Sequence, residues 1–124
     1  AGGLGFGLLL LGATRTPGIE VVTTAVGLLD RARRSDLVVT GEGSFDFSSS
    51  SGKVPYGVAQ VAGAALQPCV ALAGQVLVGS REMRTLGVEA AYSMVDLVGE
   101  QASFGDPAGS LAALAERTAR SWSR

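Results

Sequence analysis

One stretch, residues 36 to 53, carries most of the residues in this sequence that could do chemistry. It contains two carboxylates, Glu42 and Asp46, and a lysine, Lys53, separated by glycines and serines. Carboxylate oxygens can hold Mg²⁺ or accept a proton, and a lysine can neutralise phosphate charge. Backbone N–H groups at a helix start can bind further phosphate oxygens. The stretch therefore has the composition of a phosphoryl-transfer site.

The same residues also have ordinary structural explanations. Glu42 and Asp46 could be cap or turn residues, and Lys53 could be a surface cation. Two common phosphate motifs do not match. A dinucleotide fingerprint that begins at Gly41 needs its third glycine where the chain has Asp46, and a Walker A motif needs Ser or Thr where the chain has Val54. The residues alone leave the catalytic and structural interpretations open.

The neighbouring patterns predict elements that would position this stretch. The apolar run Leu37 to Val39 predicts a buried strand that opens into a loop at residues 41–43. Val54 to Leu66 predicts a helix, and Cys69 to Gly74 predicts a second buried strand. This interval fits a βαβ crossover. Ligands of open parallel sheets bind where loops leave the carboxyl ends of strands, so we expect the site there.

The rest of the chain continues the alternation of helices and strands. Before the central stretch, the patterns predict a short buried helix after the first glycines, ended by Gly12, and then one helix over 16–34. After it they predict a helix over 80–86, a strand over 88–94 and a loop over 96–105. A terminal amphipathic helix is predicted to begin at Asp106 and Pro107. We expect residues 1–124 to form a single α/β domain, a three-layer sandwich with a mostly parallel sheet.

The glycines near the start of the chain allow two interpretations. Gly2, Gly3 and Gly5 precede a run of leucines. Backbone N–H groups at the start of a helix could face an anion, which would make these glycines part of a phosphate or nucleotide site. Alternatively, the glycines serve close helix packing. The chain begins without methionine, inside a patterned region, and we expect it to be a piece of a longer polypeptide.

Composition excludes several classes of function. The net charge of −1 gives no attraction to nucleic acid or to an anionic membrane. The absence of histidine removes Ser-His-Asp and Cys-His catalysis within this chain, and most zinc chemistry. Cys69 is the single cysteine and lies in an apolar run, so we expect a buried, unreactive thiol and a cytoplasmic location. The longest apolar stretch is shorter than the ~20 residues of a membrane span.

The ordered motifs resemble the signature of the bacterial glycerate kinase family, whose members phosphorylate D-glycerate with ATP. The central match is DLVVTGEGSFD at residues 36–46, followed by Gly52-Lys53 and by GVA at residues 57–59. GGLG at residues 2–5, PGIE at residues 17–20 and VALAG at residues 70–74 also resemble family segments. The resemblance covers most of the chain up to about Gly74.

The resemblance implies a cytoplasmic kinase of two α/β domains, one of them flavodoxin-like or Rossmann-like and assembled from both ends of the full chain. This chain would be the carboxy-terminal part, an incomplete domain that is inactive alone. ATP, Mg²⁺, glycerate and the missing remainder of the parent chain are the implied partners, and a homodimer is an open alternative. The residues that carry over are Glu42 and Asp46 (catalytic or metal-binding), Lys53 (catalytic), and Gly41, Gly43, Gly52, Gly2, Gly3 and Gly5 (substrate- or nucleotide-binding).

Two departures from the family pattern leave other functions open. The family's arginine after GEG is Ser44 here, and its glutamine is Ser48, so a bidentate contact to phosphate or to the glycerate carboxylate is lost if that arginine makes one. The chain could instead be a nucleotide- or phosphate-binding module without catalysis. It could also be an inactive remnant that packs against a missing domain, which an exposed apolar face on its first helix would favour.

Overall fold

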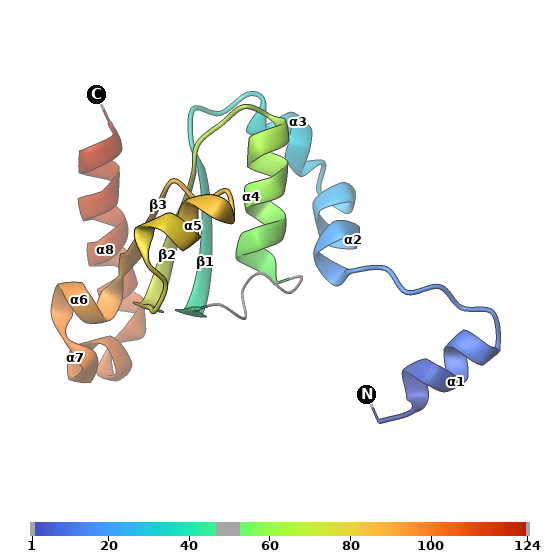
Figure 1. The fold of residues 1–124 in the computed structure, drawn as a ribbon. Helices are drawn as coiled ribbons and strands as arrows, with labels where there is room; N and C mark the ends of the chain where they lie inside the picture. Colours follow the sequence, from blue (N-terminus) through green and yellow to red (C-terminus); the bar gives the residue numbers. More distant parts are fainter. Residues whose placement is uncertain (1, 47–52, 124) are drawn as a thin grey trace.

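The computed structural model describes residues 2–46 and 53–123 of the chain. A parallel sheet of three strands in the order β1-β2-β3 forms its centre. The strands are β1 (Val38–Phe45), β2 (Cys69–Val76) and β3 (Ala90–Ser93). Helices lie on both sides of the sheet (Figure 1). The expected α/β fold, with three layers and parallel strands, is confirmed.

Two crossover units build this sheet from consecutive segments. Helix α4 (Val54–Ala64) joins β1 to β2, and helix α5 (Ser80–Thr85) joins β2 to β3, as the sequence predicted. Helix α4 packs on β1 and β2. The opposite layer consists of α6 (Met94–Val98), α7 (Glu100–Gly105) and α8 (Pro107–Trp122), of which α6 and α8 contact β2 and β3.

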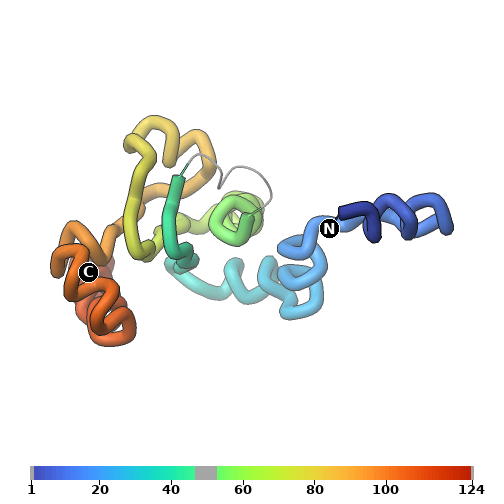
Figure 2. Tube along the Cα trace, turned by 90° about the horizontal axis from the view of Figure 1, so that it is seen from below, coloured from blue at the N-terminus to red at the C-terminus, as the bar shows by residue number. Residues whose placement is uncertain are grey.

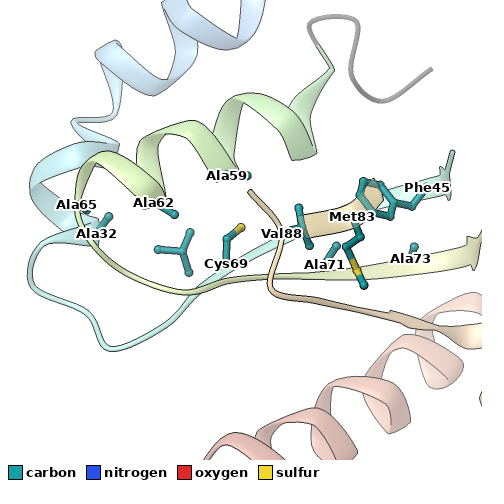
Figure 3. Packing of buried hydrophobic residues seen from close by; sticks show 11 residues of the cluster. Ala32, Phe45, Ala59, Ala62, Ala65, Cys69, Ala71, Ala73, Met83 and Val88 are labelled. Atoms are coloured by element: carbon teal, nitrogen blue, oxygen red, sulfur yellow. The ribbon is translucent and has the colours of Figure 1, made fainter. Parts of the chain in front are cut away.

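The core lies between α4 and the sheet (Figure 3). Small side chains dominate it: Ala59 and Ala62 on α4 face Cys69 and Ala71 on β2, and each is at most 1% exposed. Small residues let the helix approach the sheet closely. The predicted burial of Cys69 is confirmed, and this burial raises the pKa of its thiol to about 11, which disfavours the reactive thiolate.

Strand β1 is longer than predicted, and the expectation of a loop at residues 41–43 is wrong. The strand continues through both glycines to Phe45, because β2 offers partners along its whole length, with Glu42 opposite Ala73 and Phe45 opposite Val76. The glycines fit the sheet because the two strands come very close there: a Cβ on Gly74 would lie 2.5 Å from the carbonyl oxygen of Gly43.

The predicted single helix over 16–34 is two helices, α2 (Gly18–Ala25) and α3 (Leu28–Ala32). Gly27 separates them with a φ of 61°, a left-handed conformation that interrupts a right-handed helix. The hydrophobic spacing continues across the break, so periodicity alone did not reveal it.

The predicted loop over 96–105 is also wrong, because α6 and α7 occupy it. The hydroxyl of Ser93 accepts a hydrogen bond from the N–H of Asp96 at 3.1 Å and caps α6. Gly99, with a φ of 85°, separates α6 from α7. The capping serine is the last residue of a strand, so it did not stand out as a helix signal.

The terminal helix α8 begins as predicted. Asp106 accepts a hydrogen bond from the N–H of Gly109 at 3.0 Å, and Pro107 occupies the first turn. At the other end, Trp122 Nε1 donates to the hydroxyl of Tyr92 at 2.9 Å and ties α8 to β3. No helix in the described part of the chain combines the length and apolarity needed to cross a membrane.

The first helix, α1 (Leu4–Leu10), is exposed, and the expectation of a buried helix is wrong. It lies apart from the sheet at the end of an extended segment (Figures 1 and 2). Its large apolar side chains, including Leu4 at 71% and Phe6 at 67%, are open to solvent. An apolar run predicts burial only where another element covers it, and the described residues contain no such cover.

Candidate functional site

The carboxyl edge of the sheet brings the predicted stretch and the start of α4 together. Asp46 directly follows the last residue of β1, and Lys53 is the N-cap residue of α4. Figure 1 shows the end of β1 and the start of α4 at the same edge. The crossover therefore places Asp46 and Lys53 on the side of the sheet where parallel α/β proteins bind ligands.

Glu42 lies within β1 and not on a loop. Val38 and Thr40 are buried while Val39 is 54% exposed, so even-numbered positions in this part of the strand face α4, whereas the buried Phe45 at its end does not follow the alternation. Glu42 belongs to that series and is half-buried, and its Oε1 accepts a hydrogen bond from the N–H of Gly43 at 3.2 Å. Four residues of extended strand span about 13 Å, so Glu42 and Asp46 reach a common ion only if their side chains turn towards each other.

A chain of side-chain hydrogen bonds leads to Asp46 from the neighbouring strand. Gln75 Nε2 on β2 donates to Ser44 Oγ on β1 at 3.3 Å, and Ser44 Oγ donates to Asp46 Oδ2 at 3.5 Å. Ser44 and Gln75 are direct partners in the strand register. The sheet itself thus aligns the three polar side chains at its carboxyl edge.

A groove with a floor of glycines runs along the other face of β1 and β2. Gly41, Gly43 and Gly74 form the floor, and helices α6 and α8 contribute one wall with Met94 and Leu111. The groove encloses about 540 Å³, and a smaller hollow of about 220 Å³ adjoins it at the strand ends. A Cβ on Gly43 would meet no atom within 4 Å, so a side chain there would fill the groove itself. The glycines keep this space open.

The amino end of α4 offers backbone donors at the same edge of the sheet as the end of β1 (Figure 1). Among the described residues no side chain caps this helix, and Pro55 in its first turn has no N–H to offer. The remaining first-turn N–H groups and the positive end of the helix dipole favour an anion at this place. Lys53 is exposed at the same end, where its ammonium group adds positive charge.

The donor set suits Mg²⁺ better than a transition metal. Among the described residues, no three His, Cys, Asp or Glu side chains gather closely enough to hold a metal ion by themselves. Mg²⁺ usually takes one or two carboxylates and completes its shell with waters and substrate phosphates. Glu42 and Asp46 can supply the carboxylates, so the residues present fit a magnesium ion that arrives with a phosphorylated substrate.

The other predicted glycines lie elsewhere. Gly2 and Gly3 adopt left-handed φ values of 43° and 108°, and Gly5 is within α1. Figures 1 and 2 place this segment far from the carboxyl edge, so the described structure does not bring these glycines to Glu42 and Asp46. Gly52 lies outside the described residues.

Sequence reasoning missed Gln75 and helix α6, which forms part of the groove wall. Gln75 follows the apolar run of β2, and the expected strand ended at Gly74. A polar residue directly after a buried run could have indicated that the strand continues to the functional edge. The α6 wall, with Met94 and Val95, fell next to a segment expected to be a loop.

Comparisons with known proteins identify the family of the chain. The model of the Glycerate kinase family matches residues 1–123. Glycerate 2-kinase of Escherichia coli K12 is 40% identical over 100 residues, which cover 80% of this chain and 26% of that protein. Glycerate kinase of Halalkalibacterium halodurans is 40% identical over 96 residues, which cover 77% of this chain and 25% of that protein.

A solved structure gives the same answer for the fold. A crystal structure described as glycerate kinase 2 from Salmonella typhimurium LT2 matches with a TM-score of 0.57 at 33% identity, over 100% of this chain and 32% of that one. The chain thus spans about a quarter to a third of the length of the relatives it matches. By the family match over nearly its whole length, and by the fold and motifs that agree with it, the chain belongs to the glycerate kinase family.

Proposed function

We propose that this chain is the carboxy-terminal part of a kinase that transfers phosphoryl from ATP to D-glycerate. Membership of the glycerate kinase family supports a phosphotransferase role. The observation that carries the proposal is the placement of Asp46 and Lys53 at the two ends of the β1–α4 connection, with Glu42 on the same strand. This is the edge at which parallel α/β proteins act on their ligands.

In the proposed reaction, the bond from the γ-phosphorus to the ADP oxygen breaks and a bond to a glycerate hydroxyl oxygen forms. The hydroxyl proton passes to a carboxylate, Asp46 or Glu42, and ADP leaves. Lys53 and the first-turn N–H groups of α4 stabilise the negative charge on the transferred group. Such transfers depend on positioning and charge stabilisation, which are what this edge offers.

Magnesium and the nucleotide are bound by residues of the same region in this proposal. Mg²⁺ would neutralise charge on the phosphates, and Asp46 and Glu42 are the residues that would hold it. Gly41 and Gly43 let a ligand approach the backbone of β1 without a side chain in the way. We extend the ligand-binding role to Gly52 on the basis of the motif alone. We extend it also to Gly2, Gly3 and Gly5, which would have to move to the carboxyl edge of the sheet in the complete protein.

The remainder of the parent chain is the main partner in this proposal. In the described sheet β1 is an edge strand of eight residues, and its exposed Val39 and the apolar α1 are surfaces that a further layer would cover. We propose that the missing segments dock there and complete the cleft. The isolated chain is then inactive, and the complete enzyme works in the cytoplasm, where ATP is supplied.

The test is an assay of the full-length parent with D-glycerate and ATP·Mg²⁺, followed by mass spectrometry of the product. We expect phosphoglycerate from the parent and none from the 124-residue chain. Asp46→Asn keeps the shape and removes the charge, and we expect it to lower kcat by on the order of a thousandfold. A folded parent that forms no phosphoglycerate, or an Asp46→Asn variant with normal turnover, would contradict the proposal.

A second candidate is an interaction domain without catalysis, and the exposed α1 is the observation that favours it. In that case the parent would bind ATP without consuming it, or α1 would pair with a second copy of the chain. Calorimetry with ATP and light scattering of the full-length parent separate these outcomes from turnover. ATP binding with no loss of phosphate, or a dimer that Phe6→Asp dissolves, would favour the second candidate.

A further inference from the structure

We propose that Ser44 and Gln75 act together as positioning residues that orient the carboxylate of Asp46, an inference that rests on the proposed function. The three side chains form one line of hydrogen bonds across two strands. Gln75 Nε2 donates to Ser44 Oγ at 3.3 Å, and Ser44 Oγ donates to Asp46 Oδ2 at 3.5 Å.

The direction of these bonds follows from the groups involved. A serine hydroxyl has one proton to donate and two lone pairs to accept with. The Gln75 N–H occupies one lone pair of Ser44, so the hydroxyl proton turns away from Gln75 and towards Asp46. An ionised carboxylate is the stronger acceptor for that proton. Gln75 therefore selects the rotamer of the hydroxyl, and Ser44 holds one oxygen of Asp46.

The register of the sheet makes this arrangement firm. Ser44 and Gln75 are opposite each other in the parallel ladder between β1 and β2, and the flanking pairs, Glu42 with Ala73 and Phe45 with Val76, hold them in place. Phe45 is fully buried, so the backbone next to Ser44 cannot easily move. The 3.5 Å bond is long, and hydrogen bonds at catalytic sites often tighten only when the substrate is bound.

Ser44 stands where the family pattern has an arginine, so this chain has lost a guanidinium group at that position. The Ser44–Gln75 pair gives a neutral alternative for holding the carboxylate. The pair carries no charge of its own, so it fixes the direction of Asp46 without adding a charge beside the carboxylate. The proposed contribution is to kcat, since a positioned carboxylate matters most in the transition state.

The test uses kcat and KM of the full-length parent and its variants. Ser44→Ala and Gln75→Leu should each lower kcat by about five- to twentyfold. The KM for ATP and the KM for D-glycerate should each change less than about twofold. Ser44→Thr keeps the hydroxyl and should restore most of kcat. Gln75→Glu should lower kcat at least as much as Gln75→Leu, because its carboxylate accepts the proton of Ser44 and turns it away from Asp46.

The double variant gives the sharpest readout. If Gln75 acts through Ser44, Gln75→Leu should have no further effect on kcat in a Ser44→Ala background. The matched controls are Ser35→Ala and Gln67→Leu, which lie just before β1 and β2 at the opposite edge of the sheet. Ser35 Oγ also donates a hydrogen bond, to the Ala32 carbonyl at 2.9 Å, so its loss is chemically comparable. Both controls should leave kcat unchanged.

Two failures can be told apart. A folded parent without glycerate phosphorylation overturns the proposed function. A parent that is active, but in which Ser44→Ala keeps normal kcat or the two variants combine additively, overturns only the positioning role. The side-chain amide resonance of Gln75, followed by NMR, reports the bond without turnover: we expect it to shift on Ser44→Ala, and a resonance that stays in place overturns the inference even in an inactive parent.

Discussion

Helix α1 and the layer between α4 and the sheet are both rich in apolar residues, and they differ in what surrounds them. Phe45 in the core is fully buried, whereas Phe6 in α1 is 67% exposed. Figure 3 shows the core side chains gathered between α4 and the sheet, while Figure 2 shows α1 extending away from both. An apolar segment is therefore buried only where other elements of the molecule pack against it.

The difference extends to the role of glycine. Gly74 in β2 has no room for a side chain, because a Cβ would lie 2.5 Å from the Gly43 carbonyl oxygen. A Cβ on Gly5 in α1 would meet nothing within 4 Å beyond its chain neighbours and the backbone of its own helix. The same residue type therefore serves close strand approach in one region and lies in open space in the other.

The largest expected effect on stability comes from comparing the same truncation, Phe to Ala, in the core and in α1. Phe45→Ala should lower the free energy of unfolding of the 124-residue chain by about 3–5 kcal/mol, because it leaves a cavity in a packed core. Phe6→Ala in the 124-residue chain should change it by less than about 0.5 kcal/mol. Urea denaturation of each variant measures both. Equal losses for the two variants of the chain would contradict the contrast between the regions.

The same Phe6 variant sharpens the comparison when it is made in the parent. If the missing segments cover α1, the cost of Phe6→Ala should rise above about 1 kcal/mol there, because the side chain then leaves an apolar contact. An unchanged stability in the parent would mean that α1 stays exposed in the complete protein and does not dock as proposed.

A smaller effect should come from pH. Burial raises the pKa of Cys69 to about 11, above its ordinary value of 9.0. The thiol ionises first in the unfolded chain, so its contribution to stability is complete below pH 9 and is lost as the pH rises towards 11. The loss is at most about 3 kcal/mol. Helix α1 has no titratable side chain and should contribute nothing to this dependence.

The control for this prediction is Cys69→Ala, which removes the thiol. The free energy of unfolding of the parent, measured in urea at several pH values from 8 to 11, should fall less steeply for the variant than for the wild type. Parallel curves for the two proteins would show that Cys69 is not the source of the dependence.

The smallest effects should come from the two glycines. Gly74→Ala should lower the free energy of unfolding by about 1–3 kcal/mol, because its Cβ pushes against the β1 backbone. Gly5→Ala should increase helix content slightly without loss of stability, since alanine is favoured over glycine by about 1 kcal/mol in a helix. Circular dichroism and urea denaturation report both. A Gly74→Ala variant of normal stability would show that the strands separate more easily than the structure indicates.

Much of the fold could be predicted from local patterns. The apolar run before Gly41, the helix after Lys53 and the second run from Cys69 are confirmed as β1, α4 and β2. The Asp106-Pro107 start of α8 is confirmed as well. These signals are short in range: strand runs, capping residues and helical spacing act within a few residues. The motif order was also sufficient to indicate the glycerate kinase family.

The candidate site could be predicted only in part. The positions of Asp46 and Lys53 at the carboxyl edge follow from a strand and a helix that the sequence indicates. The roles of these residues stay predictions. The Ser44–Gln75 contact could not be predicted, because it depends on which residue of β2 lies opposite Ser44, and register is set by pairing over a distance of 31 residues in the chain.

By itself the sequence determined the alternation of strands and helices, the small residues of the core and the family. Only the tertiary structure decided that β1 continues through its glycines, that Gly27 divides a helix, and that α1 remains exposed. The physical reason is the same in each case. Hydrogen bonds across strands and burial of apolar surface need partners from distant parts of the chain. A local pattern shows that a segment requires such partners, but it does not specify which residues they are.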